Sequence, residues 1–138
     1  KVSIGLPKDC DQKIEVYLNP LLQAALASEL LVINPNTGNS GNTIEGNIEE
    51  GLCDLVILSD REDIQDSQLV LARLSKTMGV PFVYMPNDLV AQSCNADAST
   101  FRACAIVTDW SYSLPDIETV LELVKKCSKK CSKKLRVS

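Results

Sequence analysis

The sequence predicts an α/β fold, a three-layer α/β/α sandwich with a small mixed central sheet. Two short apolar runs, residues 52–60 and 80–86, are rich in β-branched and aromatic residues and do not alternate with polar ones. Strands with this pattern are usually covered by helices on both faces. Between the two runs, apolar residues at spacings of three, four and seven predict a helix with a core-facing stripe. The stripe consists of Ile64, Val70, Leu71, Leu74 and Met78.

The order strand, helix, strand predicts a βαβ unit with a right-handed crossover. Upstream of this unit, residues 1–18 show no clear pattern and are assigned to an N-terminal arm. Asn19 followed by Pro20 is a typical helix start, with Asn as the N-cap and Pro at the first helical position. We therefore predict a helix over residues 20–30 and a short strand over 31–33.

The next segment, Asn-Pro-Asn-Thr-Gly-Asn-Ser-Gly-Asn, is the most turn-rich part of the chain. It ends at Asn42, which is expected to cap a short helix over residues 43–50. Glu45 follows three residues later, in the position of a capping box. Gly51 is expected to end this helix.

The helix between the two central runs is predicted to begin near Asp63 and to end at Gly79. After the second run, Asp88 is expected to cap a helix over residues 89–94, and a strand over 102–108 follows a loop.

Ser113 and Pro115 are expected to open a last helix, whose acids come early and whose lysines come late, as the helix dipole favours. The predicted division is an arm over 1–18, an α/β/α RNA-binding-type domain over 19–126 and a basic tail over 127–138.

Charge is distributed unevenly along the chain. Seven basic and 18 acidic residues precede position 125, a net charge of −11, whereas residues 125–138 carry +7. Nonspecific nucleic-acid affinity comes from basic surface, so the acidic body does not match a protein that coats duplexes. The Lys-rich tail could anchor to phosphates or could keep a helix end soluble, and both interpretations stay open.

The sequence contains no motif that predicts catalysis or metal binding. It has no histidine, the commonest acid–base group near neutral pH, and no Cys-x-x-Cys pair for a zinc site. Asp60, Glu62 and Asp63 follow a predicted strand, where a Mg²⁺ or substrate site is one alternative, but carboxylates that open a helix are usually caps. Cys53 and Cys104 fall in predicted buried strands and are expected to stay reduced. We expect no catalytic residue, metal, cofactor, small-molecule substrate or membrane span.

Five short segments together match the pattern of one known family. They are Pro20-Leu21-Leu22 at a helix start, Gly41-Asn42, Glu50-Gly51 before a Leu-Val-Ile strand, Gly79-Val80-Pro81-Phe82-Val83-Tyr84, and Ala103-Cys104-Ala105-Ile106-Val107. Over roughly residues 19–124 the chain resembles the ribosomal L-seven-Ae and L-thirty-e superfamily. The resemblance implies the α/β/α fold and a non-catalytic, RNA-associated component of a ribonucleoprotein particle.

The resemblance also implies an RNA-contacting helix start. Kink-turn-binding members use the motif Gly-x-Asn-Glu-x-x-Lys, of which Asn42 is present here, while Thr43 and Gly46 replace Glu and Lys. Backbone amides at this start are expected to meet phosphate or a splayed base, and the lysines of the tail are expected to add salt-sensitive affinity. The expected RNA-binding residues are Ser40, Gly41, Asn42, Thr43, Gly46, Glu62, Lys125, Lys126, Lys129 and Lys130.

The end of the last strand indicates which ribonucleoprotein particle the protein belongs to. Its sequence, Val107-Thr108-Asp109-Trp110, is similar to that of the eukaryotic small-subunit ribosomal S-twelve family. The favoured interpretation is a structural small-subunit ribosomal protein in the cytoplasm. One alternative is a kink-turn-binding subunit of a box C/D, H/ACA or spliceosomal ribonucleoprotein, in the nucleolus or nucleus. Another is a protein–protein interaction module of the same fold without RNA. The expected partners are ribosomal or small nucleolar RNA and other ribonucleoprotein subunits.

Overall fold

Four strands form one mixed sheet at the centre of the fold, in the order β1-β4-β2-β3. The computed structural model describes residues 8–34, 43–107, 114 and 117–126, with side chains described from Val16 onward. β2 pairs parallel with β3 and antiparallel with β4, and β1 pairs antiparallel with β4. In chain order the elements are α1 (Lys8–Ala27), β1 (Leu31–Asn34), α2 (Ile44–Glu49), β2 (Cys53–Ser59), η1 (Glu62–Ile64), α3 (Gln65–Thr77), β3 (Phe82–Met85), α4 (Asn87–Ser93) and β4 (Ala103–Val107).

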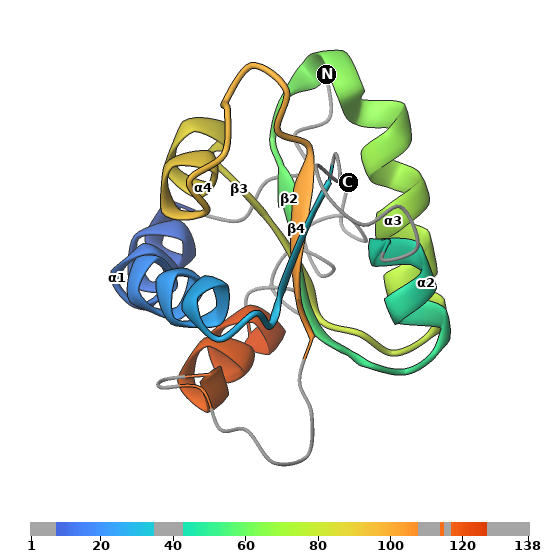
Figure 1. Ribbon diagram of the computed structural model, residues 1–138, viewed down its shortest axis with the longest axis horizontal. Coiled ribbons are helices and arrows are strands. Elements are labelled where there is room, and N and C mark those ends of the chain that lie inside the picture. The colour runs from blue at the N-terminus through green and yellow to red at the C-terminus, as the bar shows by residue number, and fades with distance from the viewer. Residues whose placement is uncertain (1–7, 35–42, 108–113, 115–116, 127–138) are drawn as a thin grey trace.

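Helices cover both faces of this sheet (Figure 1). α1, α4 and the helical residues 117–126 lie on one face, and α2 and α3 lie on the other. Successive residues of a strand point to opposite faces, so β4 sends Cys104 and Ile106 toward α1 and Ala103 and Ala105 toward α2. The structure confirms the predicted α/β/α sandwich with a mixed sheet. It also explains why residues 55–58 of β2 are all apolar, because both faces of this strand are buried.

The start of the first helix differs from the prediction. α1 begins at Lys8, so Pro20 lies inside the helix and residues 8–18 of the predicted arm are helical. The apolar residues explain this, because Leu18 and Leu21 lie on the same buried face as Leu22 and Ala25. The buried apolar stripe therefore continues past Asn19 and Pro20, and these residues do not start the helix. The side chain of Asn19 accepts a hydrogen bond from Gln23 at 3.3 Å. The division into arm, domain and tail stays a prediction.

The buried face of α3 also differs from the prediction. Val70 and Met78, which were expected to face the core, are 61% and 45% exposed, whereas Leu71 is buried. Gln68 and Ser75 take up buried positions on this helix. They can do so because each forms a hydrogen bond to a backbone carbonyl; Ser75 Oγ, for example, donates to Leu71 O at 2.8 Å.

Two predicted N-caps are wrong. Thr43, not Asn42, caps α2, because its Oγ1 accepts a hydrogen bond from Gly46 N at 3.0 Å. The third residue after the cap is therefore Gly46, and Glu45 is not in a capping-box position. Asp88 lies inside α4, which begins at Asn87 after Pro86. The expected roles of Ser113 and Pro115 are not tested, because both residues lie outside the described part of the chain. The described part also leaves out positions 35–42, 108–113, 115–116 and 127–138.

All four labelled α-helices end in the same hydrogen-bonding arrangement. The residue after each C-cap has a positive φ, and these residues are Glu29, Gly51, Gly79 and Asn95. At the end of α2, Gly51 N donates to Ile48 O at 3.1 Å and Leu52 N donates to Asn47 O at 3.0 Å. This pair of bonds is the Schellman motif, which satisfies carbonyls that the helix itself leaves unpaired. The predicted helix ends at Gly51 and Gly79 are confirmed.

Candidate nucleic-acid interface

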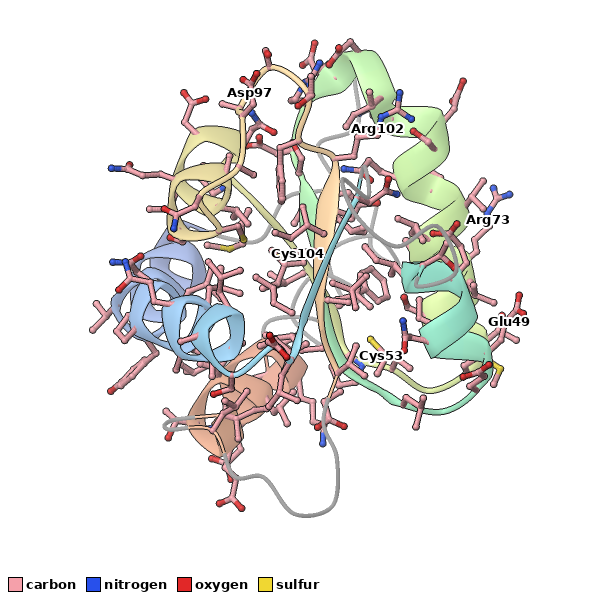
Figure 2. The ribbon with its side chains drawn as sticks, in the orientation of Figure 1. Glu49, Cys53, Arg73, Asp97, Arg102 and Cys104 are labelled. Carbon is pink, nitrogen blue, oxygen red and sulfur yellow. The ribbon has the colours of Figure 1, made fainter. Side chains whose placement is uncertain are left out.

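One end of the sheet, where β2 and β3 terminate, brings together residues that are distant in the sequence. β2 and β3 are parallel and end there at Ser59 and Met85, and β4 begins there because Ala103 pairs with both Leu58 and Asn34. Open α/β sheets bind ligands beyond the carboxyl ends of their parallel strands. We call residues 60–63, Asn87 and 95–102 the strand-end surface. Figure 2 shows Asp97 and Arg102 at this end of the sheet and Cys53 toward the other.

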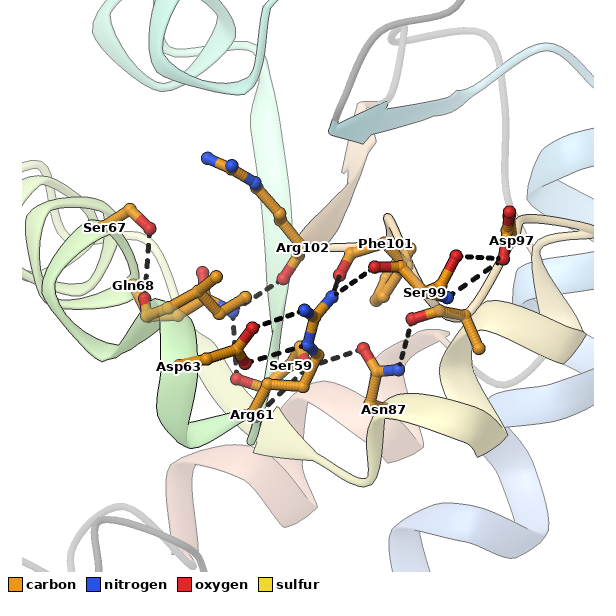
Figure 3. A network of polar contacts seen from close by, with 12 residues as sticks. Ser59, Arg61, Asp63, Ser67, Gln68, Asn87, Asp97, Ser99, Phe101 and Arg102 are labelled. Atoms are coloured by element: carbon orange, nitrogen blue, oxygen red, sulfur yellow. Dashed lines mark hydrogen bonds and ion pairs between the residues drawn. The ribbon is translucent and has the colours of Figure 1, made fainter.

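Arg61 connects the residues after β2 to the loop before β4 (Figure 3). Its Nη1 donates to Ser99 O at 3.0 Å and to Phe101 O at 3.2 Å. On the other side of the guanidinium, Nε and Nη2 donate to the two carboxylate oxygens of Asp63 at 3.0 and 2.5 Å. The hydrogen bonds from Arg61 hold the pKa of Asp63 below its ordinary value, and the pKa of Arg61 is raised in turn. The pair therefore stays charged at neutral pH.

Two more side chains hold the same loop by its backbone carbonyls. Asn87 Nδ2 donates to Ala98 O at 2.8 Å, and Asn87 Oδ1 accepts from Ser59 Oγ at 2.7 Å. Gln68 Nε2 donates to Arg102 O at 2.6 Å and to Ser59 O at 2.9 Å. Together with Arg61, these side chains bind four carbonyls of the loop and turn them inward.

The loop also has a turn of its own. Asp97 Oδ1 accepts hydrogen bonds from Ser99 N at 3.0 Å and from Ser99 Oγ at 2.8 Å, and both bonds lower the pKa of Asp97. Phe101 N donates to Asp97 O at 2.9 Å, and the Phe101 side chain is fully buried. The loop is therefore held by its own turn, by the buried Phe101 side chain, and by the hydrogen bonds from Arg61, Gln68 and Asn87.

The described part of the strand-end surface carries more negative than positive charge. Its four carboxylates belong to Asp60, Glu62, Asp63 and Asp97, against the two guanidinium groups of Arg61 and Arg102. Arg61 is paired with Asp63, while the Arg102 side chain is exposed and points away from the network (Figure 3). A surface of this kind can contact RNA through Arg102, hydroxyls and backbone groups, but it lacks a broad cationic patch.

The predicted RNA-binding residues do not all gather at this surface. Glu62 lies there, exposed at the start of η1. The exposed Lys125 and Lys126 belong to the helical residues 117–126, which lie beside the far end of the sheet, where β4 ends (Figure 1). Five of the predicted residues, Ser40, Gly41, Asn42, Lys129 and Lys130, lie outside the described part of the chain.

Thr43 and Gly46 have clear structural roles at the start of α2. Besides the cap itself, Thr43 O accepts a hydrogen bond from Asn47 Nδ2 at 2.6 Å. A Cβ at position 46 would approach Thr43 Oγ1 to 3.0 Å, which is tighter than nearly all real Cβ contacts. A side chain at position 46 would therefore require Thr43 Oγ1 to shift by a few tenths of an ångström.

Sequence reasoning missed Arg61, Gln68 and Arg102 as residues of this surface. A cation inside the acidic run Asp60–Asp63 was one available signal, since an Arg among carboxylates pairs with at least one of them. The other was a Gln on the apolar face of a predicted helix, since a buried amide needs partners. The loop carbonyls that these residues bind are more than 30 positions away, and no pattern in the sequence indicates them.

Two of the three carboxylates considered as a metal site have separate partners. Asp60 Oδ1 accepts from Asn87 N at 3.2 Å, while Asp63 is paired with Arg61. Within the described ranges, no group of three or more His, Cys, Asp or Glu residues could hold a metal ion. Among the helices in those ranges, none is long and apolar enough to cross a membrane.

Comparisons with known proteins agree with this architecture. No family model and no curated protein matches the sequence. The structure is similar to a 15.5kD RNA binding protein of Giardia lamblia, with a TM-score of 0.66 and 17% identity over 92% of this chain and 95% of that one. It is also similar to a protein of unknown function from Bacillus halodurans, with a TM-score of 0.52 and 18% identity over 78% of this chain and 95% of that one. The chain thus shares the fold of these two proteins along most of its length.

Proposed function

We propose that the protein is a non-catalytic, RNA-associated component of a ribonucleoprotein particle and that it contacts RNA at the strand-end surface. The observation that supports this most is the similarity of fold, over 92% of the chain, to a protein described as RNA binding. A fold alone does not determine function, so an RNA-associated protein also needs a surface that can make the contact.

The strand-end surface offers a loop held by hydrogen bonds and one exposed arginine, Arg102, outside the network. Proteins recognise folded RNA through its shape, its unstacked bases and its 2′-hydroxyl groups. Arg102 can bind a phosphate or stack on a base, and the exposed side chains of Ser99 and Thr100 lie beside it in the chain. With a single guanidinium outside the network, we expect binding that depends more on shape than on charge.

We further propose that the particle is the small ribosomal subunit, with the protein in the cytoplasm. This rests on the resemblance of Val107-Thr108-Asp109-Trp110 and of the acidic body to the S-twelve family. Under this proposal, residues 19–126 form the RNA-binding-type domain, and Lys125, Lys126, Lys129 and Lys130 add phosphate contacts. A kink-turn-binding subunit of a nucleolar or spliceosomal particle is the alternative, supported by the retained Asn42.

A filter-binding experiment with labelled small-subunit ribosomal RNA and an isolated kink-turn RNA tests the proposal. We expect wild-type protein to bind ribosomal RNA and Arg102→Ala to bind it about tenfold more weakly, since a cation that contacts phosphate is lost. Arg73→Ala is the matched control, because Arg73 is an exposed arginine on the outer side of α3 (Figure 2) and its loss should leave affinity unchanged.

The RNA preference and the behaviour of the native protein decide between the alternatives. Sedimentation with small ribosomal subunits supports the ribosomal particle, whereas tight kink-turn binding that Asn42→Ala abolishes supports the nucleolar or spliceosomal one. If the protein binds neither RNA and its native complex survives nuclease and high salt, the RNA-associated function is wrong and a protein-interaction module replaces it.

A further inference from the structure

We propose that Arg61 is a positioning residue for RNA binding, which fixes the loop 95–102 and thereby aims Arg102, without contacting RNA itself. This inference rests on the proposed RNA-binding function and adds to it a division of labour between two arginines at one surface. Both lie at the same end of the sheet, yet the Arg102 side chain is exposed and points away from the network that Arg61 joins (Figure 3).

The hydrogen bonds of Arg61 show that its guanidinium is already occupied. A guanidinium has five N–H donors, and four bonds from Nε, Nη1 and Nη2 go to Asp63, Ser99 and Phe101. Its positive charge is matched by the Asp63 carboxylate in a bidentate pair, and its side chain is 25% exposed. A phosphate would have to displace these partners, so Arg61 is poorly placed to bind one.

The contact with Phe101 connects Arg61 directly to Arg102. Phe101 O, which accepts from Arg61, belongs to the peptide group whose nitrogen is that of Arg102. The same Arg102 nitrogen donates to Asn34 O at 2.9 Å, and Arg102 O accepts from Gln68. Its backbone is therefore held on both sides before any RNA arrives, and an RNA that uses Arg102 does not have to order the loop.

Lysine cannot replace this arrangement. The guanidinium donates to the Asp63 carboxylate and to two carbonyls at once, whereas an ammonium is a point charge on a flexible chain. Asp63 is equally specific, because asparagine at that position keeps the shape but removes the charge that orients Arg61. Arg61→Lys and Asp63→Asn therefore test the hydrogen bonds of Arg61 with small changes in side-chain volume.

The test is a double-mutant cycle on the affinity for labelled small-subunit ribosomal RNA, using Arg61→Met, Arg102→Ala and the double variant, each over a series of salt concentrations. We expect Arg61→Met and Arg61→Lys to weaken binding about three- to tenfold, and we expect Arg61→Met to leave the salt slope of the Arg102→Ala variant unchanged, because Arg61 has no phosphate contact of its own to lose. Arg102→Ala should reduce that slope by about 0.7 to 0.9, the contribution of one phosphate contact. In the Arg61→Met background, Arg102→Ala should cost much less affinity, because the two residues act as one unit.

Asp63→Asn separates the two roles of Arg61 most sharply and serves if Arg61→Met folds poorly. A positioning role predicts that Asp63→Asn weakens RNA binding, because Arg61 then holds the loop 95–102 less firmly. A contact role predicts tighter binding and a steeper salt slope, because a cation is released and a carboxylate is lost. Amide hydrogen exchange gives a readout without RNA, in which Ser99 and Phe101 should exchange faster in Arg61→Met while Val107, at the far end of β4, should not change.

The inference is overturned if Arg61→Met keeps wild-type affinity, if its effect adds independently to that of Arg102→Ala, or if it further reduces the salt slope of the Arg102→Ala variant. These results leave the proposed RNA-binding function intact, since wild-type protein still binds. If wild-type protein binds no RNA, the proposed function fails and the inference fails with it.

Discussion

Gln68 shows how one buried polar side chain can connect several parts of the fold. It lies on the inner face of α3, is 1% exposed, and donates both of its amide hydrogens to carbonyls, one at the end of β2 and one just before β4. The bond to Ser59 O is buried, whereas Arg102 O also accepts a hydrogen bond from Ser59 N at 3.1 Å. An apolar residue of the same size would fill the space and leave both acceptors without this donor.

We expect Gln68→Leu to lower the free energy of unfolding by about 1–3 kcal/mol, the cost of removing a donor from the buried carbonyl of Ser59. Urea unfolding followed by circular dichroism measures this change. Gln65→Leu is the matched control, because Gln65 lies on the same helix with its side chain exposed, and it should change stability by less than about 0.5 kcal/mol. Equal effects of the two substitutions would show that the amide of Gln68 contributes nothing beyond its volume.

At the scale of elements, the helix ends form a natural comparison. Gly51 and Gly79 adopt a positive φ where glycine has no steric cost, whereas Glu29 adopts a φ of 60° at the equivalent position of α1. Its conformation is held by two bonds, Glu29 N to Leu26 O at 3.2 Å and Leu30 N to Ala25 O at 2.8 Å. The end of α1 therefore carries a backbone cost that the ends of α2 and α3 avoid.

Glu29→Gly should raise the free energy of unfolding by about 0.5–1 kcal/mol, because relief of the left-handed conformation exceeds the extra entropy of an unfolded glycine. Gly79→Ala should have the opposite sign and cost about 1 kcal/mol, since nothing crowds its Cβ and only the backbone conformation opposes it. Thermal or urea unfolding of the two variants tests both signs. A loss of stability in Glu29→Gly would mean that the Glu side chain makes a contact worth more than the strain.

A helix or strand could be predicted from the sequence where its bounds depend on residues close by in the chain. The strands, and the helix ends at Gly51 and Gly79, were correctly predicted because apolar runs and glycine act within a few residues. The start of α1 was not, since the Asn19-Pro20 signal is outweighed by a buried stripe that begins upstream of it. Val70 was assigned to the core because its spacing fits, whereas only the packed structure shows that Gln68 takes up a buried position instead.

The candidate site was predicted less well than the fold, for a related reason. Glu62 was expected to bind RNA from the resemblance, and its position after a strand, a local property, agrees with its place at the strand-end surface. Arg61 and Arg102 gain their roles from a loop that the fold brings to the end of β2, and the distance between these segments in the chain hides the relation. Thr43 and Gly46 were chosen by resemblance, and the structure shows a local capping bond between them.

At the scale of the whole molecule, the buried thiols make stability depend on alkaline pH. Burial raises the pKa of the Cys53 thiol to about 12, from an ordinary value of 9.0, and the pKa of Cys104 is also raised, by its hydrogen bond with Cys94 and by burial. The unfolded chain thus releases protons that the native protein retains. Their contribution to stability is complete below pH 9 and is lost as pH rises from there toward 12.

We expect the free energy of unfolding to fall above pH 9, with Cys53 contributing up to about 1.4 kcal/mol per pH unit. Urea unfolding at pH 8, 9 and 10 measures the slope in wild-type protein and in Cys53→Ala. The variant is expected to be less stable at pH 8 but to lose stability more slowly above pH 9. Parallel curves for the two proteins would show that Cys53 does not stay protonated in the native state.

The position of β4 has a consequence for how the protein is made. β1 leaves the ribosome early in synthesis, yet its hydrogen-bonding partner is the last strand of the sheet to be translated. Until then β1 and one side of β2 carry unpaired backbone groups, which other nascent chains could join. Molecular chaperones that shield extended apolar segments should therefore engage this chain until residue 107 has emerged, and release it soon afterwards.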